Sequence, residues 1–168
     1  MIPFVAIDPG RNTGWAAVGR DGEISHGWWR LGSSAATTGR CINELTTRLS
    51  EIQSRFLPES FVCEDQFIRP GVAVTVRPLL MYQGTVRAHC DRHGLAEPWM
   101  QDPSCACKAF GKPHMTKEER MKSALLLGHD VETHDETDAL GHLLYRIGIL
   151  RQMSLGIPGG GLRGKVTR

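Results

Sequence analysis

Four acidic residues occupy positions where carboxylates are costly to place. Asp8 ends the first apolar run of the chain, and Glu64 lies within the apolar run at 60–67. Asp135 and Asp138 are three residues apart, which places both on one face of a helix. Carboxylates gathered beside apolar strands lose hydration and repel one another unless cations compensate them. The pattern therefore favours a cation site built from these side chains.

Divalent cations suit this set of ligands. Carboxylate oxygens favour Mg²⁺ or Mn²⁺, and two such ions can activate a water and stabilise the leaving oxygen in phosphodiester hydrolysis. Single residues have simpler explanations: Asp8 precedes Pro9 and Gly10 and could form a turn, and Asp135 could be an ordinary acid at a helix start. Glu64 is harder to explain otherwise, because glutamate is unusual within an apolar strand.

Turn and periodicity signals predict the elements that must position these acids. Strands are predicted at 2–8, 14–19, 23–31, 60–67 and 95–101, and helices at about 38–56, 75–93, 117–127 and 135–152, with a short helix after Asp102. Asp21 and Gly22 mark a tight turn, so the first three strands form an antiparallel meander. The order predicts an α/β fold: a mixed five-stranded sheet, with the meander joined to parallel strands, flanked by helices.

Length and composition narrow the class of protein. The 168 residues fit one domain, which we place at residues 1–152, followed by a flexible, basic, glycine-rich tail at 153–168. No apolar run approaches the ~18 residues that a membrane span needs. The chain starts without the basic flank of a signal peptide, and an odd count of five cysteines fits a reducing compartment. We therefore expect a cytoplasmic protein with no membrane partner.

The net charge of +2, from 20 basic and 18 acidic residues, does not by itself indicate a nucleic-acid-binding protein. If two divalent cations neutralise the four acids, 20 basic residues stand against 14 acidic ones, which is +6. The count is therefore compatible with a polyanionic substrate. Arg69 and Arg77 follow Glu64 in a basic stretch, which is either a phosphate-contacting surface or a solvated helix face.

Three segments resemble the signature blocks of the RuvC-type Holliday junction resolvases. They are IDPGRNTGWA at 7–16, FVCEDQF at 61–67 and HDETDALGHLLY at 134–145, in the family's order and with compatible spacing across residues 2–150. The resemblance implies a ribonuclease H-like fold and a homodimer whose two active sites nick opposing strands of a four-way DNA junction, and other branched DNA as well. The compact chain is most similar to phage-encoded members. A helicase partner and the cleavage sequence preference are left open.

The resemblance also implies roles for particular residues. By position, Asp8, Glu64, Asp135 and Asp138 become the catalytic metal ligands, which hold two Mg²⁺ ions per site, with Mn²⁺ as a substitute. Phe67 matches an aromatic residue near the junction centre, where it would stack on an unpaired base; the alternative is a core position at a strand end.

Lysines near the scissile phosphate are a further property of the family. Lys117 matches one of them and is expected to hold phosphate or to stabilise developing negative charge. Lys108 matches a second, although the loop between the two is shorter than the familiar form. Lys112 lies in that loop and is a further candidate for DNA contact. Each could instead be a solvated surface lysine.

The last helix departs from the family pattern at Gly141 and His142, where small apolar residues are more usual. His142 lies four residues after Asp138, and we expect it to line a groove rather than to contact the metal site. We expect His134 to cap the helix or fill another structural position rather than to transfer a proton.

Alternatives remain open at this point. A nuclease of the same fold could act on RNA or on RNA–DNA hybrids, and a catalytically inactive relative could only bind DNA. The intact acids argue against the second, because a binding surface gains nothing from carboxylates that face phosphates. Cys90, His93, Cys105 and Cys107 could form a zinc site, but their irregular spacing favours ordinary packing.

Overall fold

The computed structural model describes residues 2–65 and 73–155. Its elements are β1 (Phe4–Asp8), β2 (Asn12–Val18), β3 (Ile24–Arg30), α1 (Thr38–Phe56), β4 (Ser60–Glu64), α2 (Ala73–Arg92), β5 (Trp99–Gln101), α3 (Ser104–Ala109), α4 (Lys117–Leu126) and α5 (His134–Ser154). This is the order of strands and helices that the sequence predicts.

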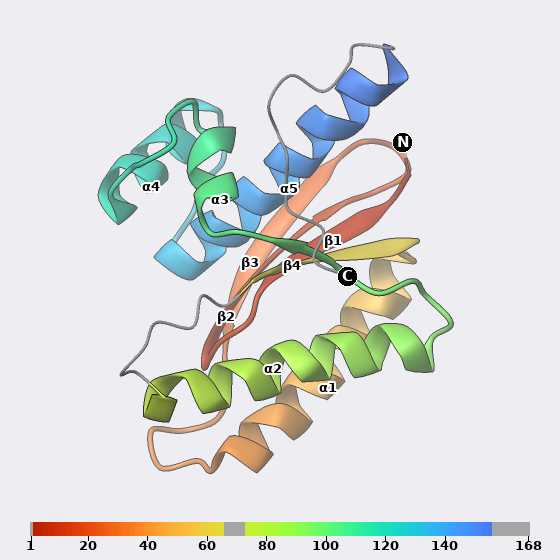
Figure 1. Cartoon of the computed structure of the whole chain (residues 1–168), viewed down its shortest axis with the longest axis vertical. Helices are drawn as coiled ribbons and strands as arrows, with labels where there is room; N and C mark the ends of the chain where they lie inside the picture. Colours follow the sequence, from red (N-terminus) through yellow and green to blue (C-terminus); the bar gives the residue numbers. More distant parts are fainter. Residues whose placement is uncertain (1, 66–72, 156–168) are drawn as a thin grey trace.

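The strands form one mixed sheet in the order β3-β2-β1-β4-β5. β1 pairs with β2 and β2 with β3 in antiparallel fashion, whereas β4 is parallel to both β1 and β5. Figure 1 shows α1 and α2 on one side of the sheet, and α5 on the other side with α3 and α4. The predicted mixed five-stranded sheet flanked by helices is therefore confirmed.

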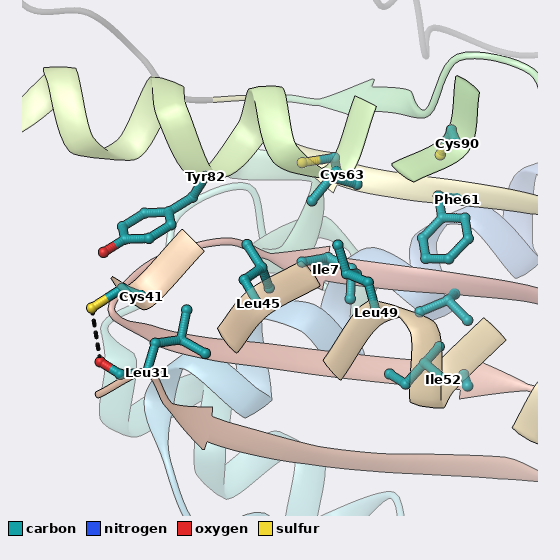
Figure 2. Packing of buried hydrophobic residues seen from close by; sticks show 13 residues of the cluster. Ile7, Leu31, Cys41, Leu45, Leu49, Ile52, Phe61, Cys63, Tyr82 and Cys90 are labelled. Carbon is teal, nitrogen blue, oxygen red and sulfur yellow. Dashed lines mark hydrogen bonds between the residues drawn. The ribbon is translucent and has the colours of Figure 1, made fainter. Parts of the chain in front are cut away.

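The core between the sheet and helices α1 and α2 fixes one face of the central strands. An apolar stripe of helix α1, with spacings of three and four residues, lies on this side: Ile42, Leu45, Leu49, Ile52 and Phe56. Figure 2 shows Leu45 and Leu49 of this stripe beside Ile7 of β1 and Phe61 of β4. Burial of each such side chain stabilises the fold by about 1.5–3 kcal/mol, so these two strands are held in one orientation.

The alternate residues of β1 and β4 therefore face α5. Ala6 and Val62 are fully buried in a second core that includes Leu140 of α5. Because successive side chains of a strand point to opposite faces, Asp8 and Glu64 continue this second set. The two carboxylates thus lie at the ends of their strands and on the side of the sheet that α5 covers.

Some element boundaries differ from the predicted ones. β4 ends at Glu64 and does not reach the predicted residue 67. β5 begins at Trp99, because Pro98 has no N–H to donate to the sheet. Helix α4 begins with a capping box: the Thr116 hydroxyl accepts from the backbone N–H of Glu119, and the Glu119 side chain accepts from the backbone N–H of Thr116.

Helix α5 ends at Ser154, and residues 156–168 of the predicted tail lie outside the described residues. Among the helices of residues 2–65 and 73–155, none combines the length and the apolar character that crossing a membrane requires.

Candidate active site

The structure brings the four predicted acids together at one edge of the sheet. β1 and β4 are parallel neighbours with Ile7 opposite Cys63, so Asp8 and Glu64 end adjacent strands on the same side. Asp135 and Asp138 lie in the first turns of α5, which crosses that side. The predicted convergence of two strand ends and one helix start is what the fold produces.

The acids destabilise one another's charged forms. Burial raises the pKa of Asp8 well above its usual range, and the charges of the three other acids raise it further. Burial is also the main cause of the raised pKa values of Asp135 and Asp138. Excess negative charge in a desolvated place is what a bound cation would relieve.

A divalent cation fits this donor set chemically, because hard carboxylate oxygens converge and the protein compensates their charge only in part. Among the described residues, no group of three or more His, Cys, Asp or Glu side chains is arranged so that it could hold a metal ion as the side chains stand. Glu64 and Asp138 are instead engaged by basic side chains of the protein, as described next.

His142 contacts Glu64 directly, which corrects the expectation that it only lines a groove. The imidazole is fully buried, and its Nε2 lies 2.9 Å from Glu64 Oε2. Its Nδ1 lies 2.9 Å from Oε1 of Gln101 on β5. The ring thus links β5, β4 and α5 through one of the four acids. Its spacing of four residues places it on the same helix face as Asp138, but nothing in the sequence indicates Glu64 as its partner.

Arg120 of α4 holds Asp138 and was not among the predicted site residues. Its Nη2 donates to Asp138 Oδ2 at 3.0 Å, and its Nε lies 2.6 Å from Oδ1. Arg120 lowers the pKa of Asp138, although burial has the larger, opposite effect. A further hydrogen bond from Nη1 to the carbonyl of Met115 orients the guanidinium. Nothing in the sequence distinguishes Arg120 from a surface arginine of α4.

The start of α5 is fixed against the sheet by close contacts. A Cβ at Gly14 of β2 would lie 1.8 Å from the carbonyl oxygen of Asp135, so only glycine permits this approach. Glu136, which is buried, accepts a 2.6 Å hydrogen bond from His26 Nδ1 on β3. These contacts set where Asp135 lies relative to Asp8.

Thr133 caps α5, since its hydroxyl accepts from the backbone N–H of Glu136 at 3.2 Å. The expectation that His134 could be the cap is therefore wrong. His134 is the first residue of the helix and lies beside Asp135, whose pKa it lowers.

The predicted basic residues divide between the site and the surface. Lys117 is the first residue of α4, and its charge lowers the pKa of both Asp8 and Asp135. Lys108 on α3 and Arg77 on α2 are exposed. Lys112 is also exposed, and its Nζ lies 4.0 Å from Oε1 of Glu119. Within the described residues, these last three make no ion pair with the four acids.

Two predicted DNA-contacting residues, Phe67 and Arg69, lie outside the described residues. The possible zinc ligands are not brought together in the part of the chain that the structure describes. Cys90 is buried in the core beside α1 and α2, whereas Cys105 and Cys107 belong to α3, which packs on α5. All five cysteines are buried free thiols.

A cleft of about 910 Å³ opens at Asp135, which is the one member of the four acids in its wall. Asp135 and Lys117 form part of its wall, together with residues from the paired ends of β2 and β3. The site is therefore open to a large ligand on the β3 side of α5.

No protein-family model matches the sequence, and a search of curated proteins finds no match. Solved structures do match. RuvC of Thermus thermophilus in complex with a Holliday junction substrate superimposes with a TM-score of 0.71 and 18% identity, over 94% of this chain and 98% of that one. A second Thermus thermophilus RuvC structure gives a TM-score of 0.67 and 22% identity, over 90% and 96%.

A eukaryotic structure gives the same result. The Holliday junction resolvase of yeast mitochondria matches with a TM-score of 0.64 and 12% identity, over 92% of this chain and 81% of that one. The three superpositions cover 94%, 90% and 92% of this chain. The chain therefore has the RuvC fold, one of the ribonuclease H-like folds.

Proposed function

We propose that this protein is a divalent-metal-dependent endonuclease that resolves four-way DNA junctions by paired nicks. The observation that carries the proposal is the convergence of Asp8, Glu64, Asp135 and Asp138 at one edge of a RuvC-type sheet. A structural neighbour with this fold is described in complex with a Holliday junction substrate. We extend the proposal to other branched DNA and to a homodimer.

Asp8, Glu64, Asp135 and Asp138 would hold the cations, which supply a Lewis acid that activates water and stabilises the leaving oxygen. Mg²⁺ is the proposed ion, with Mn²⁺ as a substitute and two ions per site. The protein's own contribution is to hold the ligands in place. His142 fixes one oxygen of Glu64, and Arg120 fixes the carboxylate of Asp138.

Lys117 is proposed to contact the phosphate at the site of cleavage. It lies close enough to Asp8 and Asp135 to lower the pKa of each, and it is exposed on the open side of the site. An ammonium group in this place can bind a phosphate oxygen and stabilise the negative charge that develops on it during hydrolysis.

The test is a nuclease assay on a mobile four-way junction with Mg²⁺, with Mn²⁺ and with EDTA. We expect symmetric nicks on opposing strands with either metal and no cleavage in EDTA. Asp8→Asn and Glu64→Gln should lose cleavage and still bind the junction. Flap DNA and an RNA–DNA hybrid are tested in parallel with the four-way junction. Faster cleavage of the hybrid than of the junction would overturn the junction assignment. Equal cleavage by Asp8→Asn would refute the proposed active site.

A further inference from the structure

The cleft beside the four acids has walls from two parts of the fold. One wall is the register pair Asn12 and Arg30, at the ends of β2 and β3, and the other comes from the first turns of α4 and α5, through Lys117 and Asp135. Its volume of about 910 Å³ is in the range of about 300–1,000 Å³ that ligand-binding clefts occupy. Because Asp135 belongs to its wall, the cleft is continuous with the candidate active site.

The sheet places Trp28 of β3 in line with the acids. Trp28 is opposite Gly14, and Gly14 is opposite Asp8, so the three positions form one row on the α5 side of the sheet. Gly14 has no side chain, and the first turn of α5 occupies the space above it. Trp28 and Asp8 therefore lie on either side of that helix start.

Arg30 follows Trp28 by two residues and so points to the same face of β3. The residue between them, Trp29, turns to the opposite face, where it stacks on Trp15 with ring centroids 5.9 Å apart. Two neighbouring positions of one edge strand therefore present an aromatic and a cationic side chain to the cleft.

The arginine side chains of the cleft differ in what they already bind. Arg11 donates to the carbonyl oxygens of Ser33 and Ala36, at 2.6 and 2.9 Å, so its guanidinium stabilises the backbone at the wall of the cleft. Arg30 is exposed, and in the part of the chain that the structure describes its side chain has no ion pair and no hydrogen bond. Its guanidinium is available for an anionic ligand, and a phosphate accepts two of its N–H groups at once.

Trp28, beside Arg30 on the same face of β3, is held in a fixed orientation. Its Nε1 donates to Glu132 Oε2 at 3.1 Å, and the residue is half-buried. The Glu132 carboxylate repels a phosphate there but leaves the ring available to an uncharged base. An aromatic surface beside a cation is the combination that binds single nucleic-acid strands.

We propose that this cleft binds the nucleotide next to the scissile phosphate, with Arg30 contacting a backbone phosphate and Trp28 contacting the base. The inference rests on the proposed nuclease function, since it takes the cleft to be the path of the cut strand. It assigns binding residues on β3, outside the three sequence segments that resemble the family's signature blocks.

The phosphate contact is tested by pairing protein and DNA changes in the full-length chain. The junction carries one uncharged methylphosphonate at each position around the mapped nick, and affinity is measured in the Asp8→Asn background. We expect one position to weaken binding about tenfold, and Arg30→Ala to weaken binding of the unmodified junction to a similar extent. In Arg30→Ala that methylphosphonate should add no further loss, and Arg30→Lys should recover part of the affinity.

Arg20→Ala is the control for general charge, because Arg20 is an exposed arginine at the opposite end of the same β2–β3 hairpin, where its Nη2 lies 3.6 Å from Glu59 Oε1. We expect this variant to keep the methylphosphonate sensitivity of the parent. Arg30→Ala should also reduce the slope of log affinity against log salt by about 1, as expected for one lost phosphate contact.

The base contact is tested with an abasic site at the neighbouring nucleotide. Loss of the base should weaken binding about fivefold or more in the parent and have no effect in Trp28→Ala. Trp28→Phe keeps an aromatic ring and should keep the sensitivity, and thermal unfolding of both variants verifies that they fold.

The outcomes separate this inference from the proposed function. If the wild-type protein cuts no branched DNA with either metal, the nuclease proposal fails. If it cuts junctions but Arg30→Ala remains as sensitive as its parent to every methylphosphonate, the nuclease proposal stands and the cleft assignment is overturned. The same conclusion follows if Arg30→Ala and Arg20→Ala lose affinity equally, since that would indicate general charge attraction only.

Discussion

Glu64 and Asp138 are each contacted directly by a basic side chain, whereas Lys117 acts on Asp8 and Asp135 through its charge. His142 contacts only Oε2 of Glu64, whereas Arg120 reaches both oxygens of Asp138. A carboxylate oxygen has two lone pairs, so an oxygen that accepts from a side chain can still bind a cation. These contacts therefore orient the ligands without removing them from the donor set.

The contact between His142 and Glu64 predicts a change in metal dependence. His142→Leu leaves Glu64 without its partner, and loss of a residue that orients a metal ligand typically costs about 10–100-fold in affinity or activity. We expect a higher Mg²⁺ concentration for half-maximal cleavage, with the KM for the junction little changed. His142→Gln retains an amide donor and should recover part of the effect. A Mg²⁺ dependence of His142→Leu equal to that of the wild type would contradict this prediction.

The raised pKa of Asp8 predicts that this residue, which the proposed cleavage requires, lowers the stability of the fold in a pH-dependent way. Its pKa is raised in the folded protein from a usual value of 3.8, so without metal the folded state binds a proton more tightly than the unfolded chain does. Its contribution to stability therefore falls as the pH rises from about 3.8 towards the raised pKa, because the unfolded chain releases the proton more readily than the folded protein does. Asp8→Asn should raise the metal-free Tm at pH 7 by about 2–4 °C while abolishing cleavage.

Thermal unfolding as a function of pH checks the sign. The difference in Tm between Asp8→Asn and the wild type should shrink as the pH falls, because Asp8 then becomes neutral in the wild type. Mg²⁺ should raise the Tm of the wild type more than that of Asp8→Asn. Asp130→Asn, which removes an exposed acid, serves as the control. A lower Tm for Asp8→Asn at pH 7 without metal would show that the Asp8 carboxylate stabilises the fold.

At the scale of elements, the site depends on how closely α5 approaches β2. Gly14→Ala would place a Cβ 1.8 Å from the carbonyl oxygen of Asp135, so α5 must shift. We expect the variant to lose about 1–3 kcal/mol of stability, the usual cost of overpacking, and most of its activity. Gly148→Ala, also involving α5, has open space around the new Cβ and should be neutral or stabilise the helix by up to about 1 kcal/mol. Urea unfolding of both variants measures the change in the free energy of unfolding. An equal loss of stability in the two variants would contradict this account.

The elements also differ in how far their structure and contacts could be predicted from the sequence. Local signals were sufficient where one element carries the information, as with the capping box of Thr116 and Glu119 or the strand end at Asp8. Contacts between distant residues were not predictable, because nothing in a single sequence pairs His142 with Glu64, 78 residues away, or Glu136 with His26, 110 residues away. The four acids were an exception, since their positions at strand and helix ends made the topology sufficient to gather them.

At the scale of the whole molecule, the formal charge of +2 conceals an uneven distribution of acidic and basic residues, which matters for the proposed DNA substrate. The acids are gathered in the site, where cations would neutralise them, while Arg30, Lys117 and other exposed basic residues surround it. Divalent metal should therefore strengthen junction binding by the wild type but not by a variant that lacks the acids. This makes the charge distribution, rather than the total, the relevant quantity for the substrate.

The proposed paired nicking requires two active sites on one junction, and it therefore predicts that the protein acts as a dimer. Light scattering should give a mass about twice the 18.6 kDa of one chain. On a supercoiled plasmid with an extruded cruciform, two nicks within the lifetime of one complex convert the circle directly to a linear molecule. A mixed dimer of wild-type and Asp8→Asn chains has one competent site and should yield nicked circles instead. A wild-type protein that accumulates nicked circles, with a mass near that of one chain, would show that the two strands are cut independently.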